Sequence, residues 1–420
     1  MEDADRLFAL SSQVESIKHF LSHSWHDSGI EKWITLCWHF NLLGALLVSS
    51  LVVAIVKVPV LMGALPEVPL HDVCGKEELR YAPWCYIAGS LSFLFCLHVW
   101  HHMPKWLLGS RAVTVFFDKL CVHQADAERK EAGILAFAAF IANSEHVLCL
   151  WSPAYFTRLW CTLEMAATVV TSNKNSALRL VFLPLKLYKF AYSMVVVLLL
   201  VRVIYAINNV TGRRIPASAL IGTFALVGPQ VLTFATRQYF SDRMDLERQL
   251  RTFSVEGAAC VSEADRAVVH QALRSWFGDL STFNELVRTQ VRAHIVAAIG
   301  SEAHVPIALN VPLMMLQVFY NMDYTMTGCY SLGDPAFNGK SVLEDLAWMF
   351  CMGSCLPVQL RIVSYLHGLP GWAVTIGLGL VVGGIFTGAF LVIFDVMGGP
   401  GPAWPMAIIT AFCGFFFLLL

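Results

Sequence analysis

Long apolar stretches alternate with polar ones along the chain. A membrane-spanning helix needs about 20 mostly apolar residues. Runs of about this length predict helices over 42–62, 85–103, 187–207, 216–236, 303–320, 346–366, 372–397 and 403–420. The fifth and sixth runs are interrupted by Pro306, Pro312, Pro357 and Arg361. We therefore expect six to eight spans and favour eight.

The polar stretches between these runs differ in charge. Basic residues are frequent in 105–186 and 237–300, whereas acidic residues outnumber basic ones in 63–84. Because cytoplasmic loops of membrane proteins are enriched in Lys and Arg, we expect the N-terminus and these two basic stretches to be cytosolic. The predicted order is a cytosolic segment 1–40, a membrane hairpin 41–104, a cytosolic segment 105–186, two spans in 187–236, a cytosolic helical hairpin 237–302 and C-terminal spans in 303–420.

The composition supports a lipid environment for much of the chain. Hydrophobic residues make up 57% of it and charged residues 14%, with a mean hydropathy of +0.61. A soluble domain carries about 25% charged residues. We therefore predict a multi-pass integral membrane protein with the lipid bilayer as a partner. The net charge of -1 gives no electrostatic footprint for nucleic acid, so no nucleic-acid partner is expected.

Two of the cytosolic segments carry a different pattern. Buried-strand patterns at 17–22, 112–118, 146–152 and 178–184 alternate, from the second strand on, with helix patterns at 126–142 and 157–171. This alternation predicts an α/β domain with a parallel sheet covered on both faces. In such sheets ligands bind beyond the carboxyl ends of the strands, where Asp118, Ser152 and the polar run 22–27 are expected.

The third cytosolic segment, 237–302, has apolar residues at helical spacing. Thr282 with Glu285 has the spacing of a capping box at the start of its second helix. We interpret this segment as a pair of packing helices rather than a site.

Several motifs resemble a known domain family. Residues 20–27 read Phe-Leu-Ser-His-Ser-Trp-His-Asp, and residues 116–119 read Phe-Phe-Asp-Lys. The most specific run is Val-Leu-Cys-Leu-Trp-Ser-Pro-Ala-Tyr at 147–155, followed by Arg-Leu-Trp-Cys-Thr-Leu-Glu at 158–164. Together these resemble the Toll/interleukin-1 receptor (TIR) domain, of the plant and bacterial type. That family has an opening F-L-S-F/Y-x-x-x-D, a strand ending in S-x-x-Y, and then S-x-W-C-x-x-E-L.

The resemblance covers roughly 15–37 and 111–185, about a quarter of the chain, and departs from the family in two places. A membrane hairpin, 42–103, separates the first strand from the second. After 178–184 the chain enters the membrane, so the family's last strand and last helix are not evident. The expected fold is therefore a membrane α-helical bundle with a cytosolic, parallel-sheet TIR-like domain that lacks its last strand. A degenerate, inactive domain remains an alternative.

The resemblance also implies a chemistry. Many TIR domains of this kind cleave NAD at the nicotinamide–ribose bond, and by position the catalytic residue is Glu164. Cleavage builds positive charge on the ribose, which a nearby carboxylate stabilises. NAD is then a substrate and not a cofactor, and no metal is expected. The residues expected to bind the substrate are Ser22, Trp25, His26, Asp118, Ser152, Tyr155 and Trp160.

Three alternatives stay open at this level. Glu164 can be a solvated residue that favours the helix dipole, with Trp160 in the core. The domain can be a non-enzymatic receptor or assembly module that forms homo-oligomers, because an open sheet edge can recruit a partner. The chain can also be a transporter or channel, since Arg202 and the group His98, His101 and His102 are ionisable residues within or next to apolar runs.

Overall fold

The computed structural model describes residues 2–70, 79–100, 113–171, 179–211, 233–234, 237–260, 263–299, 307–324 and 377. Its contacts divide the chain into two compact units. We call the first the sheet unit; it comprises Met1–Thr35, Met103–Tyr188 and Ser241–Ser301. The second, the helical unit, comprises Leu36–His102, Lys189–Phe240 and Glu302–Leu420. Each unit is therefore built from pieces that are far apart in the sequence.

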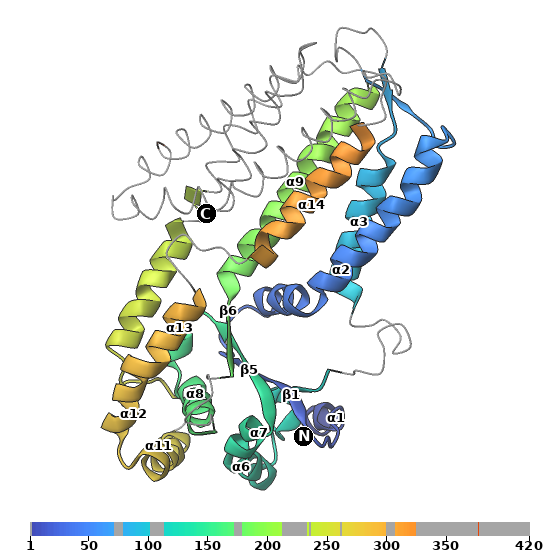
Figure 1. The fold of residues 1–420 in the computed structure, drawn as a ribbon. Helices are drawn as coiled ribbons and strands as arrows, with labels where there is room; N and C mark the ends of the chain where they lie inside the picture. The colour runs from blue at the N-terminus through green and yellow to red at the C-terminus, as the bar shows by residue number, and fades with distance from the viewer. Residues whose placement is uncertain are drawn as a thin grey trace. The chain divides into compact units, whose positions relative to one another are not determined.

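The sheet unit contains a four-stranded parallel sheet (Figure 1). Its strands are β1 (Ile17–His23), β4 (Val115–Phe116), β5 (Ser144–Trp151) and β6 (Leu180–Pro184), in the order β4-β1-β5-β6. All three pairings are parallel, which confirms the predicted parallel sheet. The second strand is shorter than the predicted 112–118, because Asp118 already begins the short helix α5 (Asp118–Cys121).

The strand order creates a switch point between β1 and β5. From β1 the chain goes to β4 on one side, and then returns to β5 on the other side of β1. In open parallel sheets, ligands bind in the crevice at such a reversal, outside the carboxyl ends of the two strands. The register pairs Ser22 with Cys149 and His23 with Leu150, so the carboxyl ends of β1 and β5 lie next to each other.

Helices on one face of the sheet bury its apolar row. In place of one predicted helix over 126–142 there are two, α6 (Ala127–Leu135) and α7 (Phe137–Ala142). The next helix, α8 (Leu159–Thr171), packs with α7 against β1 (Figure 1). Phe20 of β1 stacks on Phe116 at 4.7 Å and meets Phe137 edge-on at 5.9 Å. At the N-terminus, α1 (Glu2–Phe8) packs against α5.

The returning segment 241–301 is part of the sheet unit and has more helices than the predicted pair. A helix over 237–251 is followed by α11 (Glu263–Phe277), α12 (Leu280–Leu286), the π-helical turn η3 (Val287–Val291) and α13 (Arg292–Ile299). The cap of α12 corrects the predicted capping box, because Asp279, not Thr282, is the N-cap. Its carboxylate accepts the Thr282 N–H at 2.7 Å. α11 packs against α8, and α13 against β6.

The helical unit contains most of α2 (Gly29–Leu61) and α9 (Leu185–Thr211), with α3 (Trp84–Val99), α14 (Ile307–Tyr324) and a small antiparallel pair, β2 (Val68–Leu70) and β3 (Leu79–Tyr81). The predicted spans 42–62, 85–103, 187–207 and 303–320 fall on α2, α3, α9 and α14. Those at 216–236, 346–366, 372–397 and 403–420 lie almost entirely outside the described residues. Among the described residues, α2 is the one helix long and apolar enough to cross a membrane.

Close helix packing holds the helical unit together. The Asn41 amide of α2 donates to the Leu97 carbonyl of α3 at 2.8 Å. A side chain at Gly89 would begin 2.6 Å from the Phe319 ring, so the glycine is what lets α3 approach α14. The Asp323 carboxylate of α14 accepts the N–H groups of Cys85 and Tyr86, at 2.9 and 2.8 Å, and thereby satisfies the start of α3.

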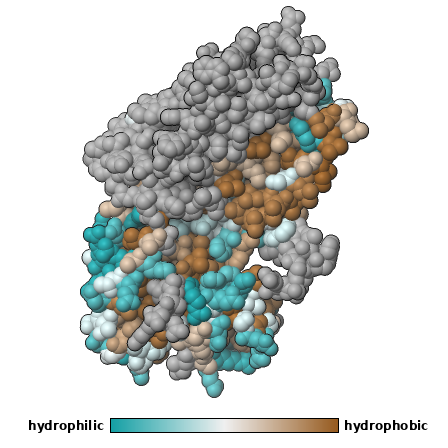
Figure 2. Space-filling model, viewed as in Figure 1, coloured by the Kyte–Doolittle hydropathy of each residue, from teal (hydrophilic) through white to brown (hydrophobic). Residues whose placement is uncertain are grey.

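The outward faces of these helices are apolar. On α2, Leu43, Leu47, Leu51 and Ile55 follow one another at steps of four residues and are each at least 60% exposed. On α3, Ile87, Leu91 and Phe95 repeat the same step. Steps of four residues keep side chains on one face of a helix. Figure 2 shows the continuous apolar surface over these helices.

The ionisable side chains that suggested a transporter or channel are described in part. His98 donates from Nδ1 to the Leu94 carbonyl at 2.7 Å, and its ring meets Tyr192 edge-on at 5.6 Å. His101, His102 and the side chain of Arg202 lie outside the described part of the chain. His98 is thus accounted for by local packing.

Candidate functional site

The candidate site lies where β1 and β5 end. β1 leads into a turn over 24–28, after which α2 begins at Gly29. β5 leads through Ser152 into the short helical turn η2 (Tyr155–Thr157) and then into α8. Both connections leave the carboxyl edge of the sheet at the switch point. They carry most of the polar residues that the sequence singled out.

Three of these residues form a buried polar network, which we call the buried trio: Ser22 of β1, Tyr155 of η2 and Glu164 of α8. The Ser22 hydroxyl donates to Glu164 Oε2 and also contacts the Tyr155 hydroxyl. A serine has one hydroxyl proton. Since Ser22 donates it to Glu164, the Tyr155 hydroxyl is the donor to Ser22. All three side chains are buried, and Glu164 is only 5% exposed.

Ser22 is a buried polar residue of β1. It lies on the same face of β1 as Phe20, because side chains two residues apart point to the same side of a strand. This face packs against α8, which brings Glu164 to Ser22 across 142 residues of sequence. The local pattern of β1 therefore places a hydroxyl where the helix presents a carboxyl group.

Burial disfavours the charged forms of the groups in and around the buried trio. Burial raises the pKa of Glu164 well above its usual range, although the hydrogen bond from Ser22 works in the opposite direction. Burial likewise raises the pKa of the Tyr155 hydroxyl and of the adjacent Cys149 and Cys161 thiols. In this conformation burial favours the protonated form of Glu164 over the carboxylate, and Glu164 accepts the Ser22 hydroxyl.

A second group of polar residues lies at the solvent-facing edge of the site. The indole N–H of Trp25 donates to Asp118 Oδ2 at 2.6 Å, while the Trp25 side chain remains 56% exposed. His23 Nε2 lies 4.0 Å from Asp118 Oδ1. We call Trp25, His23 and Asp118 the rim group. It joins the turn after β1 to the beginning of α5.

Two charged residues lie beside the rim group: Asp27, which sequence reasoning placed in the polar run 22–27 without a role, and Lys32, which it left out. Burial raises the pKa of Asp27, and a hydrogen bond from Ser152 opposes this rise. Burial lowers the pKa of Lys32, against the attraction of Asp27 and Asp118. The sequence did contain a signal for Lys32. A lysine in the first turn of a helix is unfavourable with respect to the helix dipole, which suggests that carboxylates lie nearby.

The remaining predicted residues are placed differently. His26 is exposed, and its backbone N–H donates to the Ser24 hydroxyl at 3.3 Å. Trp160 packs with its ring 6.1 Å from that of Phe137, against the apolar core. The structure thus brings together Ser22, Tyr155 and Glu164, joins Trp25 to Asp118, and packs the partly buried Trp160 against the core.

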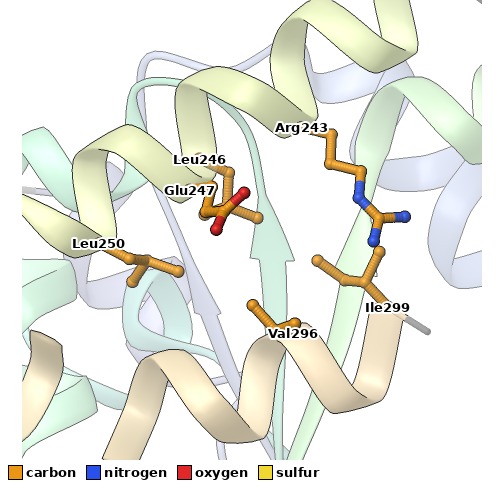
Figure 3. Close-up of a pocket in the computed structure, with 6 residues that line it drawn as sticks. All are labelled: Arg243, Leu246, Glu247, Leu250, Val296 and Ile299. Atoms are coloured by element: carbon orange, nitrogen blue, oxygen red, sulfur yellow. The ribbon is translucent and has the colours of Figure 1, made fainter. Parts of the chain in front are cut away.

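A small groove elsewhere in the sheet unit is not a second candidate (Figure 3). It is lined by Arg243, Leu246, Glu247, Leu250, Val296 and Ile299. Its volume of about 40 Å³ is far below the roughly 300 Å³ at which small-molecule pockets begin. Glu247 in its wall is already paired with Arg251 and, at 3.4 Å, with Arg292.

Comparison with known proteins adds no relative to this picture. No family model, no curated protein and no solved structure matches the chain. Within the described residues, no group of three or more His, Cys, Asp or Glu side chains is arranged to hold a metal ion.

Proposed function

We propose that the sheet unit is a TIR-like domain that hydrolyses NAD at the nicotinamide–ribose bond, with Glu164 as its catalytic carboxyl group. The observation that carries this proposal is the convergence at the switch point. Glu164 reaches the carboxyl end of β1 through Ser22, and the rim group ends the same strand. This is where a parallel sheet binds ligands, and where the TIR resemblance expects the substrate.

The proposed reaction needs one carboxylate and no strong acid. The bond between ribose C1′ and the nicotinamide nitrogen breaks, and its electron pair neutralises the pyridinium. Positive charge develops on the ribose, and the Glu164 carboxylate stabilises it. Water then adds at C1′ and releases a proton to solvent, which gives ADP-ribose. The exposed Trp25 ring offers a stacking surface at the rim.

The burial of Glu164 sets a condition on this function. A covered carboxyl group does not touch the ribose, and burial disfavours the charged form that would stabilise a cation. The proposed activity therefore includes an opening step that exposes Glu164 to water, which removes the desolvation that raises its pKa.

The test uses the full chain, purified in detergent and incubated with NAD while released nicotinamide is measured. Glu164→Gln keeps a hydrogen-bond acceptor for Ser22 but carries no charge. We expect it to release nicotinamide at least about 100-fold more slowly than the natural chain. Glu145→Gln, at an exposed glutamate of β5, is the control and should be unchanged. Equal release by Glu164→Gln would overturn the role of Glu164, and no release by the natural chain would overturn the activity.

A second candidate function has one observation of its own. The three side chains of the buried trio hydrogen-bond to one another within the protein, as a structural network does. We therefore keep the alternative that the sheet unit is a non-enzymatic module that assembles homo-oligomers. Crosslinking in membranes and light scattering in detergent measure this association. Glu164→Gln, a neutral replacement, should then leave the oligomeric state unchanged, and a strictly monomeric chain would exclude the alternative.

We also propose that the chain is a multi-pass membrane protein in which the helical unit lies in lipid and the sheet unit in the cytosol. The exposed aliphatic rows of α2 and α3 support this proposal, because soluble monomers seldom leave such continuous apolar surface in water. The 33-residue length of α2 is more than the bilayer core requires.

A further inference from the structure

The loop over 152–158 carries Ser152 and Tyr155 and is held by a distant part of the chain. The Gln249 amide donates to the Pro153 carbonyl at 2.8 Å. The Ala259 N–H donates to the Thr157 carbonyl at 2.6 Å, and the Leu159 N–H donates back to the Ala259 carbonyl at 3.1 Å. This exchange is one bridge of a parallel ladder. We call residues 249–260 the brace.

The brace is itself fixed by side chains of the helices that follow it. The Asn284 side chain is buried and accepts the Val255 N–H at 2.9 Å. Arg288 donates to the Phe253 carbonyl at 2.8 Å, and Arg266 to the Ala258 carbonyl at 3.0 Å. The brace is therefore tied to α11, α12 and η3 on one side and to the loop on the other.

The brace continues into a helix that is connected to the expected membrane spans. Gln249 is the third residue from the end of the helix over 237–251, which in sequence follows the predicted span 216–236. Near the start of this helix, the buried Asp242 carboxylate pairs with Lys186 Nζ at 2.8 Å. Lys186 is the second residue of α9, on which the predicted span 187–207 falls. The helix that ends in the brace is thus joined to the start of α9 by an ion pair.

The loop also covers the candidate catalytic group. The Tyr155 hydroxyl contacts Ser22, whose hydroxyl in turn contacts Glu164, and Tyr155 is fully buried. We infer that the brace is an autoinhibitory contact: it holds the loop over 152–158 closed on Ser22 and Glu164, and its release opens the loop and exposes Glu164. The opening of the loop is inferred from these contacts alone, whereas its effect on NAD cleavage rests on the proposed function.

Hydrogen exchange of the full chain in detergent tests the opening. Gln249→Leu removes the donor to Pro153, and Ala259→Pro removes the N–H that binds Thr157. The amides of Tyr155, Arg158 and Leu159 should exchange about two- to tenfold faster in each variant, the range expected for one lost hydrogen bond. Arg248→Ala is the control, because this exposed side chain pairs with Asp245 on its own helix and should change nothing.

Unchanged exchange over 154–159 in Gln249→Leu would overturn the inference. If Ala259→Pro does not fold, Gln249→Glu replaces it, since a carboxylate also lacks the donor and repels the Pro153 carbonyl. Amides of β1 serve as an internal reference, and their exchange should stay constant.

Nicotinamide release then separates the two proposals. Faster release by Gln249→Leu than by the natural chain supports an autoinhibitory brace, and slower release overturns it. If exchange over 154–159 is faster in Gln249→Leu but neither this variant nor the natural chain cleaves NAD, the closing contact is supported and the proposed activity is excluded. If the natural chain cleaves NAD and exchange is unchanged, the activity stands and the brace falls.

Discussion

The two compact units differ in how far they expose aliphatic side chains to their surroundings. In the sheet unit, Leu148 and Leu150 of β5 are fully buried. In the helical unit, Leu47 and Leu51 of α2 are 63% and 60% exposed. The residue type is the same, but its surroundings differ. The sheet unit is stabilised by withdrawing leucine from water, whereas the exposed leucines of the helical unit are what its proposed location in lipid predicts.

The largest effect is expected when a charge enters the sheet unit. Leu150→Arg places an unpaired guanidinium among the buried side chains of β5, which should lower the free energy of unfolding by about 4 kcal/mol or more. Denaturant unfolding, followed by exchange of the β1 and β5 amides, measures this loss. A sheet as stable as that of the natural chain would mean that this face of β5 is open to water.

A leucine-to-arginine substitution in the helical unit should reduce membrane insertion and not the stability of the sheet. Leu51→Arg puts the charge near the centre of the predicted span 42–62, at a cost of about 3 kcal/mol for the inserted state. An insertion assay on α2 measures the fraction that spans the membrane, with Leu51→Ile as the matched control. The sheet unit should keep its natural exchange pattern. Full insertion of the arginine variant would contradict a lipid-facing position for this row.

The pH dependence of stability should report on Glu164. Folding raises the pKa of Glu164, because burial disfavours its charged form, so the folded chain binds this proton more tightly than the unfolded chain does. Stability from this group is fully present below the unfolded pKa, near 4.5, and is lost as the pH rises through the folded value. The buried His23, whose pKa is lowered by burial, works in the opposite direction.

Comparing two chains isolates the contribution of Glu164, because His23 is common to both. The Tm of Glu164→Gln, relative to that of the natural chain, should therefore increase between pH 5 and pH 8. A constant difference in Tm across this range would mean that Glu164 is ionised in the folded protein, against its burial.

The smallest effect is expected at the rim group. Trp25→Phe retains an aromatic ring but removes the N–H that binds Asp118, and the position is largely exposed. We expect the free energy of unfolding to change by less than about 0.5 kcal/mol. Trp25→Ala also removes the ring and should raise the KM for NAD about tenfold, whereas Trp25→Phe should raise it less. Equal KM values in both variants would remove Trp25 from the proposed substrate surface.

The sheet could be predicted because its signal is local. Apolar runs with helices between them identified β1, β5 and β6 to within about two residues, and a polar run after β1 indicated the edge that matters. The ends of the helices and strands were predicted less accurately than their existence. Asp118 begins a helix rather than ending a strand, and Asp279 rather than Thr282 caps α12, because several nearby residues can serve and tertiary contacts choose among them.

The candidate site was predictable only in part. The TIR resemblance, not periodicity, selected Ser22, Tyr155 and Glu164, which the fold then brings together across 133 and 142 residues. Trp160 carries the same motif and nevertheless packs into the core. The contact of Gln249 with Pro153 could not be predicted from the local sequence pattern. It joins a glutamine side chain to a backbone carbonyl 96 residues away, and a polar residue in a helix is ordinarily expected to face solvent.

The assembly of the sheet unit from three separate pieces has a consequence for biosynthesis. β1 leaves the ribosome about 90 residues before β4, with α2 and α3 synthesised in between. Until β4 and β5 follow, its row of buried side chains has no partner and its backbone edges are open. The covering helices of 263–299 are made only after α9. Such late, long-range pairing is slow, and an unpaired strand is prone to aggregation. We therefore expect β1 to depend on chaperones in the interval before β4 and β5 are made.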